Sequence, residues 1–165
     1  MSPDRKKNIG VAIDLGTTSI ACAAMDLDDG KPIGRQVRPN PKSVWGADVV
    51  ARMSALKADP ELLLVMSERT VGVCNEMIRS LASPSDVDEI VVAGNPVMQA
   101  ILLRVSPLSL ARPPYRPPFK EAQRVQADEF GFNTRRCAGL YVFPQIGGFV
   151  GGDAVAVALS LHMGK

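Results

Sequence analysis

Residues 9–20 of the chain read Ile9-Gly10-Val11-Ala12-Ile13-Asp14-Leu15-Gly16-Thr17-Thr18-Ser19-Ile20. The first apolar run is rich in β-branched residues and stops at Asp14. A glycine and three hydroxyl residues come next, and a second apolar run begins at Ile20. Apolar runs bracketed by turn residues are typical of strands joined by a tight turn. The stretch therefore predicts a β-hairpin near the start of the fold.

The turn of this hairpin has the chemistry of a phosphate site. Backbone N–H groups and the hydroxyls of Thr17 and Thr18 are donors suited to phosphate oxygens. Gly16 lacks a Cβ, so a phosphate can approach its main chain closely. Asp14 can hold a hydrated Mg²⁺, which prefers oxygen ligands and keeps several waters. The alternative is an ordinary hairpin in which the Asp and Thr residues only make turn hydrogen bonds.

Composition limits the class of protein. The chain has 165 residues, of which 46% are hydrophobic and 22% charged, values typical of one globular domain with a sizeable core. The net charge of +2 and the lack of a basic stripe argue against nucleic-acid binding. Residues 1–8 form a polar leader without the apolar run of a signal peptide, and no apolar run is long enough for a bilayer. We therefore expect a soluble, cytoplasmic protein without a membrane partner.

Cysteine usage gives no sign of a metal site. Cys22, Cys74 and Cys137 are far apart, and no Cys-x-x-Cys or Cys/His cluster occurs. We expect each cysteine to be a small core residue. The single histidine, His162, has no obvious partner and receives no role.

Hydrophobic periodicity predicts a mixed α/β domain. The expected strands are 9–14, 18–26, 31–38, 87–93 and 140–143. The expected helices are one from Ala47, one from Pro60 to about Ser83, one over 97–104 and one over 153–162, while 106–136 is expected to be a long loop pinned to a surface. The sheet should begin antiparallel and continue parallel.

Two further turns carry candidate site residues. Gly94 and Asn95 end a buried-type strand, where ligand sites of α/β proteins form; Asn95 could contact a phosphate or cap the next helix. Gly151 and Gly152 permit close backbone approach, either to phosphate or to the hairpin. Asp153 follows them at an expected helix start, and its position fits an N-cap.

Three other side chains have competing interpretations. Asp48 and Arg52 are four residues apart on the first expected helix, so a surface ion pair is the simpler interpretation. An interface role is the alternative. Trp45, the only tryptophan, is either a packing anchor or a partner contact.

The motif Asp14-Leu15-Gly16-Thr17-Thr18-Ser19 resembles the first phosphate motif of the actin, Hsp70 and sugar-kinase superfamily. The order of expected elements also matches one lobe of that superfamily. The resemblance implies a ribonuclease H-like, actin-like α/β lobe: a mixed sheet with an N-terminal β-hairpin and flanking helices. In such proteins the hairpin cradles nucleotide phosphates, and an acidic or amide residue near the position of Asp153 places the attacking group.

Four further segments resemble the reductive activators of corrinoid proteins, and with the hairpin they extend the resemblance over Ile9 to His162. They begin at Asn40-Pro41-Lys42, Gly94-Asn95-Pro96, Pro113-Pro114-Tyr115 and Phe143-Pro144-Gln145. The family implies ATP hydrolysis coupled to electron transfer onto a cob(II)alamin protein. By this resemblance the cofactors are ATP and Mg²⁺, and the partner is a corrinoid protein. Asp14 and Asp153 are the catalytic candidates, with Asp14 also the metal ligand, and the nucleotide-binding candidates are Gly16, Thr17, Thr18, Gly94, Asn95, Gly151 and Gly152.

The chain departs from this family in two respects. Family members carry an iron–sulfur domain, and superfamily members continue into a second lobe with another phosphate motif. We therefore expect residues 9–165 to be the first lobe only, with the iron–sulfur cluster in a missing domain and ATP poorly bound by the lone lobe. Two other functions stay open: a non-catalytic domain that docks a partner through residues 106–119, and a lobe of a small-molecule kinase with Asp153 as base. A homodimer also stays open.

Overall fold

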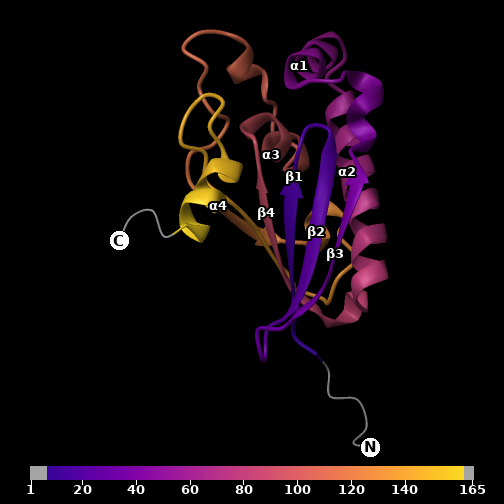
Figure 1. Cartoon of the computed structure of the whole chain (residues 1–165). Helices are drawn as coiled ribbons and strands as arrows, with labels where there is room; N and C mark the ends of the chain where they lie inside the picture. Colours follow the sequence, from indigo (N-terminus) through magenta and orange to yellow (C-terminus); the bar gives the residue numbers. More distant parts are fainter. Residues whose placement is uncertain (1–6, 162–165) are drawn as a thin grey trace, which may run out of the picture.

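A computed structural model describes residues 7–161, with the side chains of residues 42 and 43 outside the description. Figure 1 shows a sheet whose strands run between two groups of helices. The strands are β1 (Ile9–Leu15), β2 (Ser19–Asp26), β3 (Pro32–Pro39), β4 (Val87–Gly94), β5 (Gln123–Gln126) and β6 (Gly139–Val142). The α-helices are α1 (Val49–Ala58), α2 (Leu62–Leu81), α3 (Pro96–Leu102) and α4 (Gly152–Ser160). Short 3₁₀ turns are η1 (Pro41–Trp45), η2 (Pro84–Asp86), η3 (Leu108–Ala111) and η4 (Asp128–Phe130).

The six strands form one mixed sheet in the order β3-β2-β1-β4-β6-β5. β1 and β2 pair antiparallel, with Leu15 opposite Ile20, so the predicted hairpin is confirmed. β4 lies parallel to β1, and β6 lies parallel to β4. The predicted α/β class, with an antiparallel start and a parallel continuation, is therefore confirmed.

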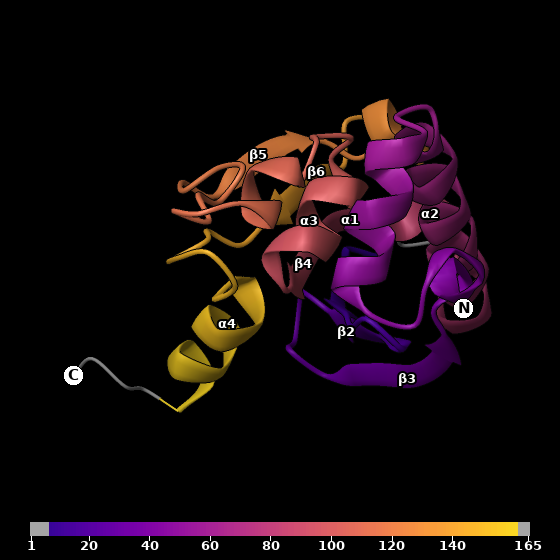
Figure 2. The same ribbon diagram turned by 90° about the horizontal axis from the view of Figure 1, so that it is seen from above.

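Helices α2 and α3 cover one face of this sheet (Figure 2). α2 buries a stripe at helical spacing that includes Met66, Thr70, Cys74 and Met77. Cys74 and Met77 share one core cluster with inward-facing strand residues, among them Ile9, Val11, Ile13, Leu15, Ile20, Ile90 and Val92, whereas Met66 lies in a second cluster with Met53 and Leu56. α2 begins at Leu62 rather than at Pro60, and the N–H of Glu61 bonds the Asp59 carboxylate at 3.1 Å.

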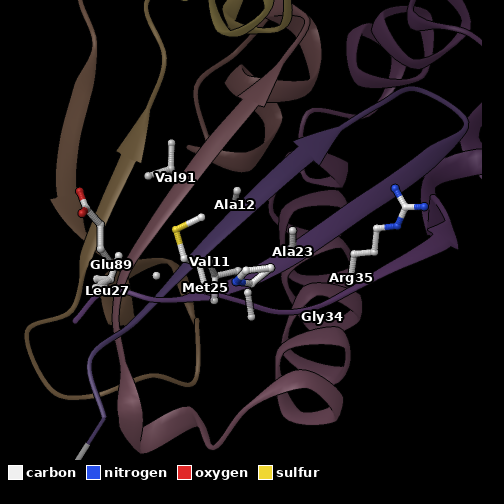
Figure 3. Close-up of a pocket in the computed structure, with 12 residues that line it drawn as sticks. Val11, Ala12, Ala23, Met25, Leu27, Gly34, Arg35, Glu89 and Val91 are labelled. Atoms are coloured by element: carbon white, nitrogen blue, oxygen red, sulfur yellow. The ribbon is translucent and has the colours of Figure 1, made fainter. Parts of the chain in front are cut away.

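The opposite face of the sheet carries several small side chains and a hollow of about 400 Å³. In Figure 3, Ala12, Ala23 and Val91 lie along this hollow, with Glu89 and Arg35 at its two ends. A neighbouring hollow extends to Asp14 and to Ala156 of α4. α4 thus lies on this face, across the sheet from α2, as Figure 2 shows. We call this face the open face and the other the covered face.

The segment 106–136 differs in part from the expected loop. It contains β5, an edge strand that pairs antiparallel with β6. The sequence Gln123-Arg124-Val125-Gln126 is mostly polar, as an edge strand with one side toward solvent permits. It therefore has no run of alternating apolar residues from which a strand could be predicted. The proline-rich part is pinned as predicted, since Leu110 is buried and the Tyr115 ring lies 5.9 Å from the Phe149 ring.

The prediction that all three cysteines lie in the core is only partly correct. Cys22 and Cys74 are buried as predicted, but Cys137 is exposed, so its assignment to the core was wrong. Cys137 has a φ of +63° and lies in a surface turn before β6. His162 lies outside the described residues. Among residues 7–161, no cluster of three or more metal-ligating side chains occurs and no helix is long and apolar enough to cross a membrane.

Candidate functional site

The first component of the candidate site is the turn between β1 and β2, residues 16–18. It lies at the carboxyl end of β1, directly after Leu15 pairs with Ile20. A Cβ on Gly16 would lie 2.6 Å from the Ser19 carbonyl oxygen, a distance that side chains do not tolerate. The turn itself therefore requires glycine at this position, independently of any ligand.

The second component follows β4, the strand beside β1. Register places Gly94 opposite Leu15, so both strands end at the same edge of the sheet. The Asn95 side chain accepts a bond from the Met98 N–H at 3.0 Å and so caps α3. Its amide nitrogen donates to Thr17 Oγ1 at 3.1 Å. The predicted cap is confirmed, and the same side chain joins two turns that are 78 positions apart.

The third component is the start of α4. A Cβ on Gly151 would lie 2.7 Å from both the Gly94 carbonyl oxygen and Pro96 Cδ. A Cβ on Gly152 would lie 2.4 Å from the Gln99 side chain. Both glycines therefore allow the start of α4 to pack closely against the turn after β4, rather than against the hairpin.

Asp153 is not the N-cap of α4. The helix begins at Gly152 and its N-cap is Gly151, so the N-cap interpretation was two positions too late. Asp153 lies in the first turn, is exposed, and accepts a bond from the Ala154 N–H at 2.8 Å. A carboxylate in the first turn of a helix is stabilised by the helix dipole.

Two carboxylates lie near enough at this edge of the sheet for one charge to act on the other. Asp14 lies on the open face, where partial burial raises the pKa of its carboxyl and the negative charge of Asp153 raises it further. Asp14 as a whole residue is exposed. Desolvation and a like charge both disfavour the ionised form, and a bound cation would relieve both.

A buried amide cluster that the sequence did not reveal supports the third component. Gln99 is fully buried, donates to the Phe143 carbonyl at 3.0 Å and accepts from the Gly152 N–H at 3.4 Å. Gln145, also buried, donates to Gln99 Oε1 at 3.3 Å. The signal in the sequence was Gln99 itself, a polar residue among the apolar residues from Val97 to Leu102 of α3.

The expected surface ion pair between Asp48 and Arg52 was wrong. Asp48 caps α1 by accepting the Ala51 N–H at 2.8 Å. Arg52 is 0% exposed and its guanidinium donates to main-chain oxygens of two loops. Trp45 is half-buried against the cluster of Met53 and Leu56 and has the Arg69 guanidinium 5.2 Å from its ring centre, so it is a packing anchor.

The sequence pattern of one family, described as "RACo middle region", matches residues 9–165. The chain belongs to this family. It is 27% identical over 170 residues to a corrinoid activation enzyme, RamQ, of Eubacterium limosum, covering 99% of this chain and 29% of that protein.

A solved structure gives the same result. The fold superimposes with a TM-score of 0.91 and 26% identity on a reductive activator for corrinoid, iron-sulfur protein, covering 97% of this chain and 26% of that one. The predicted family resemblance and the predicted α/β fold, a mixed sheet with flanking helices, are confirmed. The chain spans less than a third of the length of either relative.

Proposed function

We propose that this chain supplies the first, phosphate-binding lobe of an ATP-hydrolysing activator of corrinoid proteins. The observation that carries the proposal is the meeting of three turns at one edge of the sheet. Asn95 donates to Thr17 Oγ1, and Gly151 packs against Gly94, so residues 16–18, 94–96 and 151–153 adjoin. Family membership and the names of the two relatives support the same function.

In this proposal the nucleotide phosphates lie against the three turns. The N–H groups and hydroxyls of Gly16, Thr17 and Thr18 donate to phosphate oxygens. The candidates Gly94, Asn95, Gly151 and Gly152 form the neighbouring wall. Donors fixed in advance around a transferring phosphoryl group stabilise the charge that develops there.

Asp14 is the residue that would hold Mg²⁺. The fit rests on its chemistry and position, because the carboxylate lies on the open face near the carboxyl end of β1 and Mg²⁺ prefers carboxylate and water oxygens. A bound Mg²⁺ neutralises charge on the transferring phosphate. Asp153, exposed at the start of α4, would orient the attacking water.

The remaining parts of the function lie outside residues 9–165. In the proposal a second lobe would complete the nucleotide cleft, an iron–sulfur domain would hold the electron donor, and the partner would be a corrinoid protein. Hydrolysis then drives a conformational change that permits electron transfer onto the cob(II)alamin cofactor.

The first test uses the 165-residue chain. It should bind Mg-ATP weakly and show no turnover, because a half-built site leaves the phosphates in water, where contacts are worth little. Isothermal calorimetry and a phosphate-release assay measure both. Tight binding of ATP would contradict the half-site argument.

The second test uses a protein that joins this chain to a second lobe. Asp14→Ala should lower ATP hydrolysis by about 100-fold or more while leaving the fold intact. The matched control is Asp28→Ala, an exposed aspartate beyond the opposite end of β2. Unchanged hydrolysis in the Asp14 variant would contradict the Mg²⁺ assignment.

A further inference from the structure

Three consecutive carbonyl groups of the β1–β2 turn are held from outside the hairpin. The Gly16 oxygen accepts from Asn40 Nδ2 at 2.7 Å, and the Thr17 oxygen accepts from Arg52 Nη2 at 2.7 Å. The Thr18 oxygen accepts from the Asn40 N–H at 2.8 Å. Asn40 lies between β3 and η1, and Arg52 lies in α1, so two separate segments fix this turn.

Holding the carbonyls also fixes the direction of the N–H groups. In a planar trans peptide the C=O and the following N–H point to opposite sides. The Thr17 N–H therefore points away from Asn40, and the Thr18 N–H points away from Arg52. Within residues 7–161 neither of these N–H groups donates to another main-chain group. Each of these two adjacent donors is therefore held on the side of its peptide plane away from Asn40 or Arg52.

Arg52 is an unusual residue for this purpose because its charge is buried. Its side chain is 0% exposed, and within the described part of the chain no carboxylate lies within ion-pair distance of it. Burial lowers the pKa of the Arg52 guanidinium while the charge of Asp48 raises it, and burying a charge without a close ion pair is unfavourable unless hydrogen bonds compensate. Arg52 donates to Gly46 O at 3.2 Å and to Met98 Sδ at 3.1 Å besides Thr17 O. Packing alone would be satisfied by an apolar side chain of similar volume.

We propose that Arg52 and Asn40 are positioning residues that aim the turn's N–H groups at a phosphate, with the Arg52 charge behind the turn adding attraction for the anion. This inference rests on the proposed phosphate site. Neither residue touches the phosphate in this arrangement, because each binds the opposite side of the peptide planes. The fork of the guanidinium links the loop at Gly46 to the turn at Thr17, a link that a lysine ammonium reproduces only in part.

The test is an NMR titration of the ¹⁵N-labelled 165-residue chain with Mg-tripolyphosphate at constant ionic strength. The lone lobe is expected to bind weakly, so the titration extends to high tripolyphosphate concentration, where the amide signals of Thr17 and Thr18 in the unaltered chain should still shift. Arg52→Met should weaken the apparent affinity by about tenfold or more, since charge-assisted contacts are lost. Arg52→Lys should retain part of it. Asn40→Asp, which replaces the donor to Gly16 O by an acceptor, should also weaken binding.

Ile101→Val is the matched control, because Ile101 is buried in the same apolar cluster as Met53 and Leu56. It should lower the melting temperature without changing the affinity for tripolyphosphate. If the unaltered chain gives no shifts at Thr17 and Thr18, the phosphate site and this inference fall together. If it binds and both Arg52→Lys and Asn40→Asp bind equally well, the positioning role is wrong while the phosphate site stands. Should Arg52→Met not fold, Arg52→Lys and Asn40→Asp decide the question.

Discussion

The covered and open faces of the sheet are built from the same strands with opposite chemistry. On β4, Ile90 and Val92 point into the core beneath α2, and neither is exposed. Val91 and Ala93, between and beside them, line the open face. The period of two along a strand puts successive side chains on opposite faces. One strand therefore contributes to the core and to a separate surface.

The difference shows where stability and function lie. The covered face carries branched side chains whose burial stabilises the fold. The open face carries small side chains such as Ala12 and Ala23 and ends in the carboxylate of Asp14. Only α4 lies on it among the described helices, and Leu159 of α4 is still 61% exposed. The open face therefore leaves space around the Asp14 carboxylate and contributes little buried apolar surface to the fold.

The largest expected effect is a difference in the loss of stability between substitutions at two neighbouring residues of β4, Ile90 and Val91. Ile90→Ala should lower the free energy of unfolding by about 2–5 kcal/mol, because the substitution leaves a cavity in the covered face. Val91→Ala, on the open face, should lower it by less than about 1 kcal/mol. Urea denaturation followed by circular dichroism measures both. Equal losses at the two positions would contradict the distinction between the faces.

A smaller effect concerns how α4 is held on the open face. Gly151→Ala should lower the free energy of unfolding by about 1–3 kcal/mol, because the added methyl group would meet main-chain atoms of Gly94 and Pro96. The control is Gly147→Ala in the same glycine-rich turn, where a Cβ would meet nothing within 4 Å. That variant should change stability by about 0.5 kcal/mol at most. Thermal melting of both proteins, with the fluorescence of Trp45 as the probe, gives the comparison.

Much of the fold could be predicted from the sequence because the covered face imposes strong periodicity. The hairpin, α2 and β4 each place apolar residues at the spacing of their element. β5 could not be predicted, since an edge strand with the sequence Gln123 to Gln126 has one apolar residue and takes its conformation from β6. The start of α2 was missed by two residues because Asp59 bonds the N–H of Glu61 just outside the helix.

The site was predictable where local chemistry determines it and not where packing does. Asp14 and Gly16 stand out because a strand end and a tight turn are local features. Arg52 was misassigned because Asp48 lies four residues before it, the spacing of a surface pair, whereas its burial depends on the hairpin turn far away in sequence. The roles of Asp14, Asp153 and the glycine turns in nucleotide binding stay predictions.

The smallest expected effect concerns the charge at the end of the open face. Partial burial, and then the charge of Asp153, raise the pKa of Asp14 in the folded protein above its unfolded value. A raised folded pKa means that the folded state binds the proton more tightly than the unfolded chain does, so stability is greatest below the unfolded pKa and declines as pH rises through the folded one.

Asp14→Asn removes this decline. At pH 7 the variant should therefore be more stable than the unaltered chain by about a few tenths of a kcal/mol, a small value because solvent screens the charge. The gain should vanish below about pH 3.5, where the carboxyl is protonated in both states. Urea titrations at a series of pH values measure the difference. Asp153→Asn loses the helix-dipole stabilisation in either background but relieves the charge repulsion only when Asp14 is present, so it should be less favourable in the Asp14→Asn background if the two carboxylates act on each other. A loss of stability at pH 7 in Asp14→Asn would show that the carboxylate stabilises the fold, and the case for a site that favours a cation would fail.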